Sequence, residues 1–221
     1  LQRLAAIDAL HWVRVLYTYP DTVTPALIDE LRGNEKLVNY LDMPLQHVND
    51  DLLRAMHRRG SQAHIRRVLE HVAAHAPEFI LRTTMMVGFP GETDAQFQEL
   101  LAFLRDHPFD RVGAFAFSPE EGTEAAAMPR QIPEDVKQAR LDALMSQQRG
   151  ISRARGQRRI GQTVEVLIEG ADAHGAFGRS YAEAPDVDGR ILLPGAAAQA
   201  GTYRLARLTA ANDYDMIGEL L

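Results

Sequence analysis

The chain has 221 residues, of which 46% are hydrophobic and 24% charged, a composition typical of a folded globular protein. It excludes a disordered chain, a collagen-like repeat and a coiled-coil rod. The 24 basic and 30 acidic residues give a net charge of -6, which excludes the overall basic field of a general nucleic-acid binder.

Two absences narrow the class of protein further. The chain contains no cysteine, so by itself it cannot form a disulfide, a thiolate zinc site or a cysteine-ligated iron–sulfur cluster. No stretch approaches the roughly 18 consecutive apolar residues of a membrane helix, and no secretory signal is visible. We therefore expect a cytoplasmic protein with no membrane partner.

Residues 1–129 alternate between helix-like and strand-like patterns. This order is typical of parallel strands joined by right-handed crossovers, so we expect an α/β barrel or part of one. The opening segment LQRLAAIDAL is helix-like with no strand before it, which indicates an excised piece lacking an upstream strand. The patterns predict strands over residues 12–19, 39–45, 79–87 and 111–117, and helices over residues 26–32, 49–75 (interrupted near Gly60) and 94–106.

Charge and pattern both change after this first block. Residues 1–129 hold 12 basic and 18 acidic residues, residues 130–160 hold 8 and 3, and residues 161–221 hold 4 and 9. The middle segment is predicted to form a basic helical connector, from Pro133 to about Gly156. The last segment has period-two patterns over residues 163–169, 177–181, 189–193 and 203–209, which predict a small antiparallel β-barrel.

In a parallel α/β barrel, ligands bind at the carboxyl ends of the strands. The turn VGFPGET (Val87–Thr93) follows one such end. Its glycines, Gly88 and Gly91, would let the backbone approach a ligand closely, and the helix that follows offers free N–H groups. The alternative is a tight turn with a purely structural role.

Other polar residues near strand ends leave two interpretations open. Gln46 and His47 follow the second predicted strand, where they could bind a ligand or serve as structural partners in a loop. Glu120 and Glu121 could act as an acid–base pair or diverge into solvent. Arg82 lies in an otherwise apolar strand, so it needs a carboxylate inside the barrel or an anionic ligand.

Two basic patterns on predicted helices are less specific. His71 and His75 have the spacing of a two-histidine metal site, but no third ligand is evident and a solvated helix face is favoured. The arginines of the connector could contact RNA phosphate or form a solvated helix end stabilised by the helix dipole. They are Arg149, Arg153, Arg155, Arg158 and Arg159.

Three segments of the first block resemble the later part of radical S-adenosylmethionine methylthiotransferases. They are YLDMPLQH (Tyr40–His47), LRTTMMVGFPGET (Leu81–Thr93) and FDRVGAFAFSPEEGTEA (Phe109–Ala125). The segments GRSYAEAPDVDGRILL (Gly178–Leu193) and DYDMIGEL (Asp213–Leu220) resemble the TRAM domain of the same family. The resemblance spans essentially the whole chain, with the motifs in the family's order.

The resemblance implies a fold and a set of domains. The fold class is α/β, the C-terminal part of a radical SAM partial (β/α) barrel followed by a small antiparallel, OB-like β-barrel. The expected divisions are residues 1–129 for the partial barrel, 130–160 for the connector and 161–221 for the TRAM barrel. Intact enzymes of the family also carry an N-terminal domain and two [4Fe-4S] clusters on cysteines, one set in a CxxxCxxC loop. None of those cysteines exists here.

Site residues follow from the same resemblance. S-adenosylmethionine is the implied cofactor, its radical takes hydrogen from the β-carbon of a target aspartate, and a methylthio group is then transferred. A protonated His47 or Arg82 could hold carboxylates. No metal ligand is expected in this chain. The residues matched to the cofactor pocket are Gln46, Arg82, Gly88, Phe89, Gly91, Glu92, Phe117 and Ser118, and those matched to substrate binding are His47, Glu183, Asp186 and Asp188.

The implied substrate is an aspartate of small-subunit ribosomal protein twelve. The acidic last block favours this basic partner over RNA, because complementary charge favours association. One alternative is a related enzyme that methylthiolates an adenosine of tRNA, and another is a cluster-free module that binds ribosomal protein or RNA. An RNA contact through the basic connector is compatible with all three of these functions. Without cysteines, the chain alone is expected to be inactive.

Overall fold

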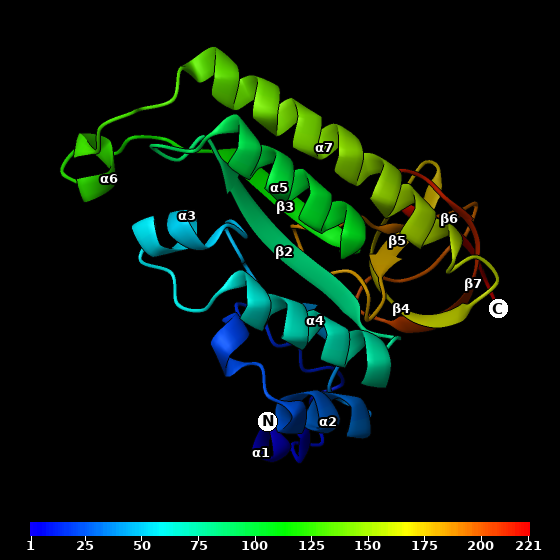
Figure 1. Ribbon diagram of the computed structural model, residues 1–221. Helices are drawn as coiled ribbons and strands as arrows, with labels where there is room; N and C mark the ends of the chain where they lie inside the picture. The colour runs from blue at the N-terminus through cyan, green and yellow to red at the C-terminus, as the bar shows by residue number, and fades with distance from the viewer.

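The computed structural model describes residues 1–221. Three parallel strands form the centre of its first part (Figure 1). They lie in the order β1 (Tyr40–Asp42), β2 (Ile80–Val87) and β3 (Arg111–Ala116). The register sets Asp42 beside Arg82 and Arg82 beside Arg111. Consecutive parallel strands with helical crossovers are the arrangement predicted from the sequence.

Seven α-helices accompany this sheet, and the long ones among them cover one of its faces. They are α1 (Gln2–Ala5), α2 (Pro25–Gly33), α3 (Asp50–Ala55), α4 (Gln62–His75), α5 (Asp94–Asp106), α6 (Glu124–Ala127) and α7 (Glu134–Gln157), with a 3-10 turn, η1 (Pro20–Thr22). A single core of 24 buried residues joins this face to α4, α5 and α7. None of the helices combines the length and apolarity needed to cross a membrane.

Helix ends follow the local sequence closely. The hydroxyl of Thr93 accepts from the N–H of Gln96, and the Gln96 amide oxygen accepts from the N–H of Thr93, so the capping box begins α5 as predicted. The predicted 49–75 helix is divided into α3 and α4, with Gly60 at φ +97° between them. This break confirms the predicted interruption.

The predicted strand over residues 12–19 is wrong. This segment makes only one isolated bridge, Val13 with Leu37, and its one other backbone bond to the sheet runs from the N–H of Thr18 to the carbonyl of Asp42. Tyr17 at φ +64° interrupts the extended run. A β-branched, aromatic segment becomes a strand only where a neighbour pairs along its length, and here none does.

The last part of the chain closes into a barrel in the order β4-β5-β6-β8-β7. The pairs are antiparallel except β6 with β8, which are parallel, so the prediction of a wholly antiparallel barrel needs this correction. The last strand follows the segment 212–215 and was not among the predicted strands. The strands are β4 (Thr163–Asp172), β5 (Gly175–Arg179), β6 (Ile191–Pro194), β7 (Tyr203–Ala211) and β8 (Met216–Leu220).

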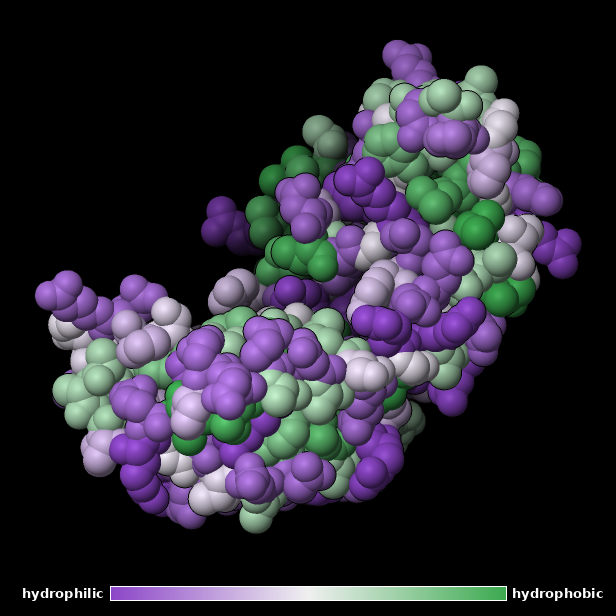
Figure 2. Space-filling model, turned by 90° about the horizontal axis from the view of Figure 1, so that it is seen from above, coloured by the Kyte–Doolittle hydropathy of each residue, from purple (hydrophilic) through white to green (hydrophobic).

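Helix α7 and one loop of the barrel connect the two parts. The helix runs along the first part and ends at the barrel (Figure 1), and the loop Ser180–Gly189 packs against the amino-terminal end of the sheet. Ala182 and Ala184 of this loop join a small core with Tyr40 and Ile80. Figure 2 shows the bent outline that results, with hydrophobic patches among hydrophilic residues.

Candidate functional site

Gln46 lies at the carboxyl end of the sheet in an unusual backbone conformation. Its φ is +68°. Its N–H donates to the carbonyl of Thr84 (2.8 Å) and its carbonyl accepts from the N–H of Met86 (2.7 Å), so it pairs with β2 beyond the end of β1. Its side-chain oxygen is buried and has no hydrogen-bond partner. With Met86 and Phe89 it lines a cavity of about 220 Å³. Strained residues with unused polar groups are common at ligand sites, so the sheet's end is a candidate.

The loop after β2 is held by its own glutamate. The N–H of Gly88 donates to the carboxylate of Glu92, and the N–H of Glu92 donates to the carbonyl of Phe89 (2.9 Å). Gly88 and Gly91 have positive φ values of +75° and +84°. Burial raises the pKa of Glu92, while Arg140 and the N–H donors act in the opposite direction. Glu92 therefore fixes the glycine loop from inside through one oxygen, while its Oε1 is buried without a hydrogen-bond partner, so its assignment to the cofactor pocket stays a prediction.

Aromatic and basic side chains surround this loop. The rings of Phe89 and Phe117 meet edge to face with centroids 5.3 Å apart, and the ammonium of Lys137 lies 5.6 Å from the Phe117 ring. Lys137 also packs against Gly88, where a methyl group would collide with it. Ser118, next in the chain, is exposed. Lys137 and Arg140 were not predicted, because a helical i, i+3 pair of basic residues gives no signal of what it contacts.

His47 is buried beside this loop and is uncharged at neutral pH. Its Nδ1 accepts from the N–H of Asn49 at 3.0 Å, so the proton is on Nε2, which has no partner. Burial, and then the charge of Arg140, lowers the pKa of His47 to about 4. Desolvation therefore favours the neutral ring in the chain alone, which disfavours a protonated His47 that holds a carboxylate, and that role stays a prediction.

Arg82 pairs with carboxylates of the protein, which is the first of the two interpretations that the sequence left open. Its Nη1 donates to Asp42 at 2.9 Å, and its Nε lies 3.7 Å from Asp188 of the barrel loop. Five residues separate it from Val87 at the end of β2, roughly 16 Å at the rise of a strand. The structure therefore separates Arg82 from the glycine loop with which it was grouped.

Two of the predicted substrate-binding acids are inside the molecule. Glu183 is fully buried and pairs with Arg159 and Arg111, while its other oxygen accepts from Ser180. Burial alone would raise the pKa of Glu183, but the charges of Arg159 and Arg111 and the hydrogen bond from Ser180 hold it below its usual range. The carboxylate is thus a structural ion at the domain junction, which corrects its assignment to substrate.

Asp188 has the same structural role, and Asp186 does not. Asp188 accepts from the hydroxyl of Tyr40 at 2.7 Å and from the N–H of Ala184 at 2.8 Å, and its side chain is 2% exposed. These bonds and its contact with Arg82 make the carboxylate a structural group of the domain junction, which corrects its assignment as a free substrate contact. Asp186 is exposed and remains available.

The arginines of the connector divide between interior and surface. Arg159 is buried against Glu183, and Arg155 contacts Asp110 at 3.2 Å. Arg149 and Arg153 are about 60% exposed (60% and 62%) and approach Asp213 at 3.9 and 4.0 Å. The connector therefore offers a smaller basic surface than its sequence indicated, since two of its arginines are used within the structure.

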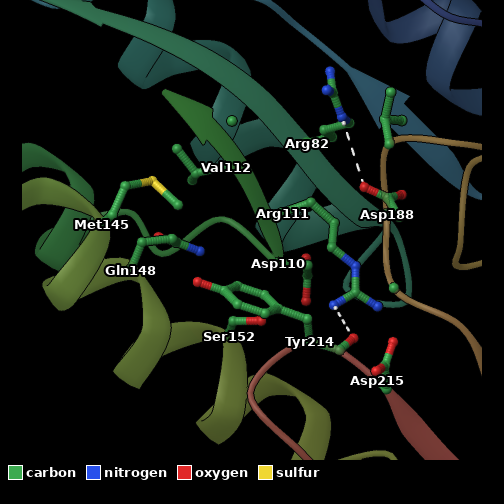
Figure 3. A pocket seen from close by; sticks show the side chains of 13 residues that line it. Arg82, Asp110, Arg111, Val112, Met145, Gln148, Ser152, Asp188, Tyr214 and Asp215 are labelled. Atoms are coloured by element: carbon green, nitrogen blue, oxygen red, sulfur yellow. Dashed lines mark hydrogen bonds and ion pairs between the residues drawn. The ribbon is translucent and has the colours of Figure 1, made fainter. Parts of the chain in front are cut away.

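A second cavity lies where the sheet, α7 and the barrel meet. Its volume is about 410 Å³, and Figure 3 shows Gln148 and Ser152 of α7 on one side with Arg82 and Asp188 on the opposite side. Tyr214, before β8, lies beside Ser152 in the same view. The sequence analysis named two residues of this cavity, Arg82 and Asp188, but did not group them, because they come from segments more than 100 positions apart.

Comparison with known proteins agrees with this architecture. The model of the Radical SAM superfamily matches residues 1–104, and that of the TRAM domain matches residues 160–221. A solved structure described as coproporphyrinogen III oxidase from Escherichia coli, a radical SAM enzyme, covers 90% of this chain and 46% of its own, at 14% identity and a TM-score of 0.47. That likeness is too weak to carry an argument.

Curated relatives match the chain along its length. A protein of Bdellovibrio bacteriovorus named ribosomal protein uS12 methylthiotransferase RimO is 42% identical over 100% of this chain and 49% of its own length. Proteins of the same name from Desulforudis audaxviator and Geobacter sulfurreducens are 44% and 41% identical, again over 100% of this chain and 49% and 50% of theirs. The chain thus spans about half the length of these relatives. With a partial radical SAM barrel followed by a TRAM barrel, it belongs to the radical SAM methylthiotransferase family.

Proposed function

We propose that this chain forms about half of an enzyme that methylthiolates the β-carbon of an aspartate in ribosomal protein uS12. One observation carries the proposal. The whole chain, both barrels included, aligns at 41–44% identity with proteins named for that activity. The whole enzyme's activity, substrate and partners are inferred from those relatives.

The carboxyl end of the sheet fits part of S-adenosylmethionine. Gln46 presents an unpaired side-chain oxygen there, which suits an N–H donor of a nucleoside or an amino group. Met86 and Phe89 supply an apolar wall, and Gly88, at φ +75°, lets the chain turn just before Phe89. A volume of about 220 Å³ holds one portion of the cofactor, such as its base. When bound, S-adenosylmethionine supplies the radical chemistry of the family.

The residues of this chain position the cofactor and exclude water. Glu92 fixes the glycine loop through the N–H of Gly88, so the loop is preorganised before any ligand arrives. Phe117 packs behind Phe89 and keeps the cavity wall apolar. His47, neutral and buried, supports the loop that follows it by accepting from Asn49.

The residues present do not fit an iron–sulfur cluster. The chain contains no cysteine, so thiolate ligands for either cluster would have to come from outside it. We expect the 221-residue chain alone to be inactive, because it lacks the ligands for the reducing centre.

The charge of the barrel supports a basic protein as substrate. Residues 161–221 hold 9 acidic and 4 basic residues, a balance that repels RNA phosphate and attracts a basic ribosomal protein. Asp186 is exposed on this barrel and remains a candidate contact. Arg149 and Arg153 leave a limited surface for RNA near the bound protein.

The test uses a complete enzyme that contains this chain, supplied with S-adenosylmethionine, a reductant and a sulfur source. We expect the mass of uS12 to increase by one methylthio group in place of hydrogen, and tRNA to remain unmodified. Modification of tRNA in place of uS12 would contradict the substrate. A Gln46→Leu variant should raise KM for S-adenosylmethionine about tenfold, as expected for the loss of one buried hydrogen bond of about 1.4 kcal/mol. An unchanged KM would remove Gln46 from the cofactor site.

A further inference from the structure

We propose that the cavity between the sheet, α7 and the barrel is a docking site for a basic side chain of a partner protein segment. The proposal rests on the proposed function for the identity of that partner, the protein substrate, and otherwise on this cavity alone. Its volume of about 410 Å³ exceeds that of the cavity at the carboxyl end of the sheet. An arginine or lysine side chain with its adjoining backbone fits such a space.

The cations inside the cavity already have carboxylate partners. Arg82 is held by Asp42 and Asp188, and Arg111 by Glu183 at 3.3 Å. These carboxylates are almost completely buried, so the pairs are fixed parts of the floor. An incoming anion would have to compete with three protein carboxylates for these guanidinium groups, which disfavours a phosphate or carboxylate ligand.

Two acids of the segments that form the cavity, in contrast, have no cationic partner: Asp215 lines it, and Asp186 precedes Val187, which lines it. Asp215 lines the cavity and accepts only a backbone N–H, from Arg190, at 2.8 Å. Asp186, two residues before Asp188 on the exposed side of the same loop, makes no hydrogen bond or ion pair. The nearby arginines Arg149 and Arg153 approach Asp213 instead. The two free carboxylates therefore favour an incoming cation.

The wall formed by α7 requires hydrogen-bond donors. Gln148 uses its amide N–H on the carbonyl of Phe109 (3.1 Å), which leaves its oxygen without a donor, and Ser152 has no partner for its hydroxyl. Both residues are at least 97% buried, with exposed fractions of 1% and 3%. A guanidinium or ammonium group supplies several donors at once. On the opposite wall the Nε of Arg111 has no acceptor, and a backbone carbonyl of the same segment would supply one.

The rim supplies apolar surface for the stem of such a side chain. Val187 is 58% exposed and Tyr214 is 42% exposed, and both line the cavity. Lysine and arginine bury their methylene stems against apolar groups, and an aromatic ring also attracts the cation. An apolar rim with free carboxylates and buried acceptors matches a basic peptide better than RNA, whose phosphates the carboxylates repel.

Binding is measured by NMR titration of the 221-residue chain with the capped tripeptide acetyl-Gly-Arg-Gly-amide. The same tripeptide with citrulline in place of arginine is the matched neutral probe. We expect shifts at Gln148, Ser152 and Tyr214 with the arginine probe and at least fivefold weaker binding of the citrulline probe. Equal binding of the two probes, or shifts confined to other surfaces, would overturn the proposal.

Two variants locate the effect. Asp186→Asn with Asp215→Asn should lower affinity for the arginine probe about fivefold, since each exposed charge contributes about 0.5 kcal/mol. Asp29→Asn removes an exposed carboxylate on α2 and should leave affinity unchanged. If both variants lower the affinity for the arginine probe equally, the probe is attracted only by the overall charge of the chain. Tight binding of an RNA decamer that shifts the same resonances would also contradict a protein ligand.

The link to the substrate is tested separately in the complete enzyme. The paired variant Asp186→Asn, Asp215→Asn should raise KM for uS12 about fivefold and leave KM for S-adenosylmethionine unchanged. If the tripeptide binds but KM for uS12 does not change, the pocket holds a basic segment of another protein, and its assignment to the substrate fails. If uS12 is not modified at all, the proposed function fails while the tripeptide result still stands.

Discussion

The hydroxyl of Tyr40, on the first strand of the sheet, donates to the carboxylate of Asp188 in the barrel loop at 2.7 Å, although 148 residues separate them in sequence. Burial, and then the charge of Asp188, raises the pKa of Tyr40, so the hydroxyl keeps its proton. The face of the same ring lies 4.3 Å from the guanidinium of Arg14, which donates to three carbonyls of the barrel loop. The two barrels are thus joined by specific polar contacts as well as by apolar packing.

Removing that hydroxyl tests the contact. Tyr40→Phe should lower the free energy of unfolding by about 1–2 kcal/mol, because Asp188 loses a donor in a buried place while the ring still packs. Urea unfolding of the chain measures the change. Tyr19→Phe is the matched control, since the hydroxyl of Tyr19 makes no hydrogen bond in the structure. Equal effects of the two substitutions would contradict a role for the Tyr40–Asp188 bond.

Glu183→Gln should be more destabilising than Tyr40→Phe. The substitution removes the carboxylate that neutralises Arg159 and Arg111, both of which remain in the domain junction. Breaking a buried ion pair from one side costs about 3–5 kcal/mol. Asp186→Asn, three positions along the same loop but exposed, should change stability by no more than about 0.5 kcal/mol. A loss below about 1 kcal/mol for Glu183→Gln, measured by thermal or urea unfolding, would show that the junction tolerates the unpaired cations.

Because His47 is buried in its neutral form, we expect the free energy of unfolding to fall in mild acid. The pKa of His47 is about 4 in the folded chain, below the ordinary value of about 6.5 expected when unfolded. The unfolded state therefore binds more protons between these values, so the contribution of His47 is complete above about pH 6.5 and is lost as pH falls toward 4. The full shift corresponds to about 3 kcal/mol.

Urea unfolding at pH 7.5 and pH 5 measures this dependence. His47→Asn keeps an acceptor for the N–H of Asn49 but cannot take up a proton, so its stability should fall less between the two pH values. His174→Asn changes an exposed histidine and should follow the unsubstituted chain. If His47→Asn retains the full pH dependence, the titrating group lies elsewhere.

Gly88 and Gly122 separate two effects of adding a methyl group. Both have positive φ, +75° and +81°, so alanine is strained at either position. A Cβ at Gly88 would also collide with the stem of Lys137, whereas at Gly122 it meets open space. Gly122→Ala should cost about 1 kcal/mol, and Gly88→Ala about 2–3 kcal/mol. Gly88→Ala should also weaken S-adenosylmethionine in the complete enzyme. Equal losses of stability would mean that Lys137 moves aside without cost.

Local sequence predicted most elements of the fold, because their signals act within a few residues. The capping residues at Thr93 and Gln96 set the start of α5, and the alternation over residues 163–169 is found within β4. The strand predicted over residues 12–19 failed for a physical reason. Its pattern specifies an extended, partly buried segment, but a strand also needs a partner along its length, which the sequence pattern does not provide.

The candidate site was predicted only in part. The glycine loop with Gly88 and the neighbouring Gln46 carried recognisable motifs, and the structure brings them to one end of the sheet. Arg82 was grouped with them although it lies farther down β2, because a motif gives position in the chain and not depth in a sheet. Lys137 and Arg140 were missed, since long-range packing of α7 places them against the loop.

The sequence by itself determined the family, the order of the two barrels, the positions of most helices and strands, and the absence of any thiolate ligand in this chain. These properties depend on residue identity, spacing and periodicity, which are all given by the order of residues in the chain. The tertiary structure decided which charges are structural and which are free. Glu183, Asp186 and Asp188 lie within six positions and look alike in sequence, but two are desolvated against arginines or a tyrosine and one faces water. Because burial depends on what packs from distant segments, only the folded chain could separate them.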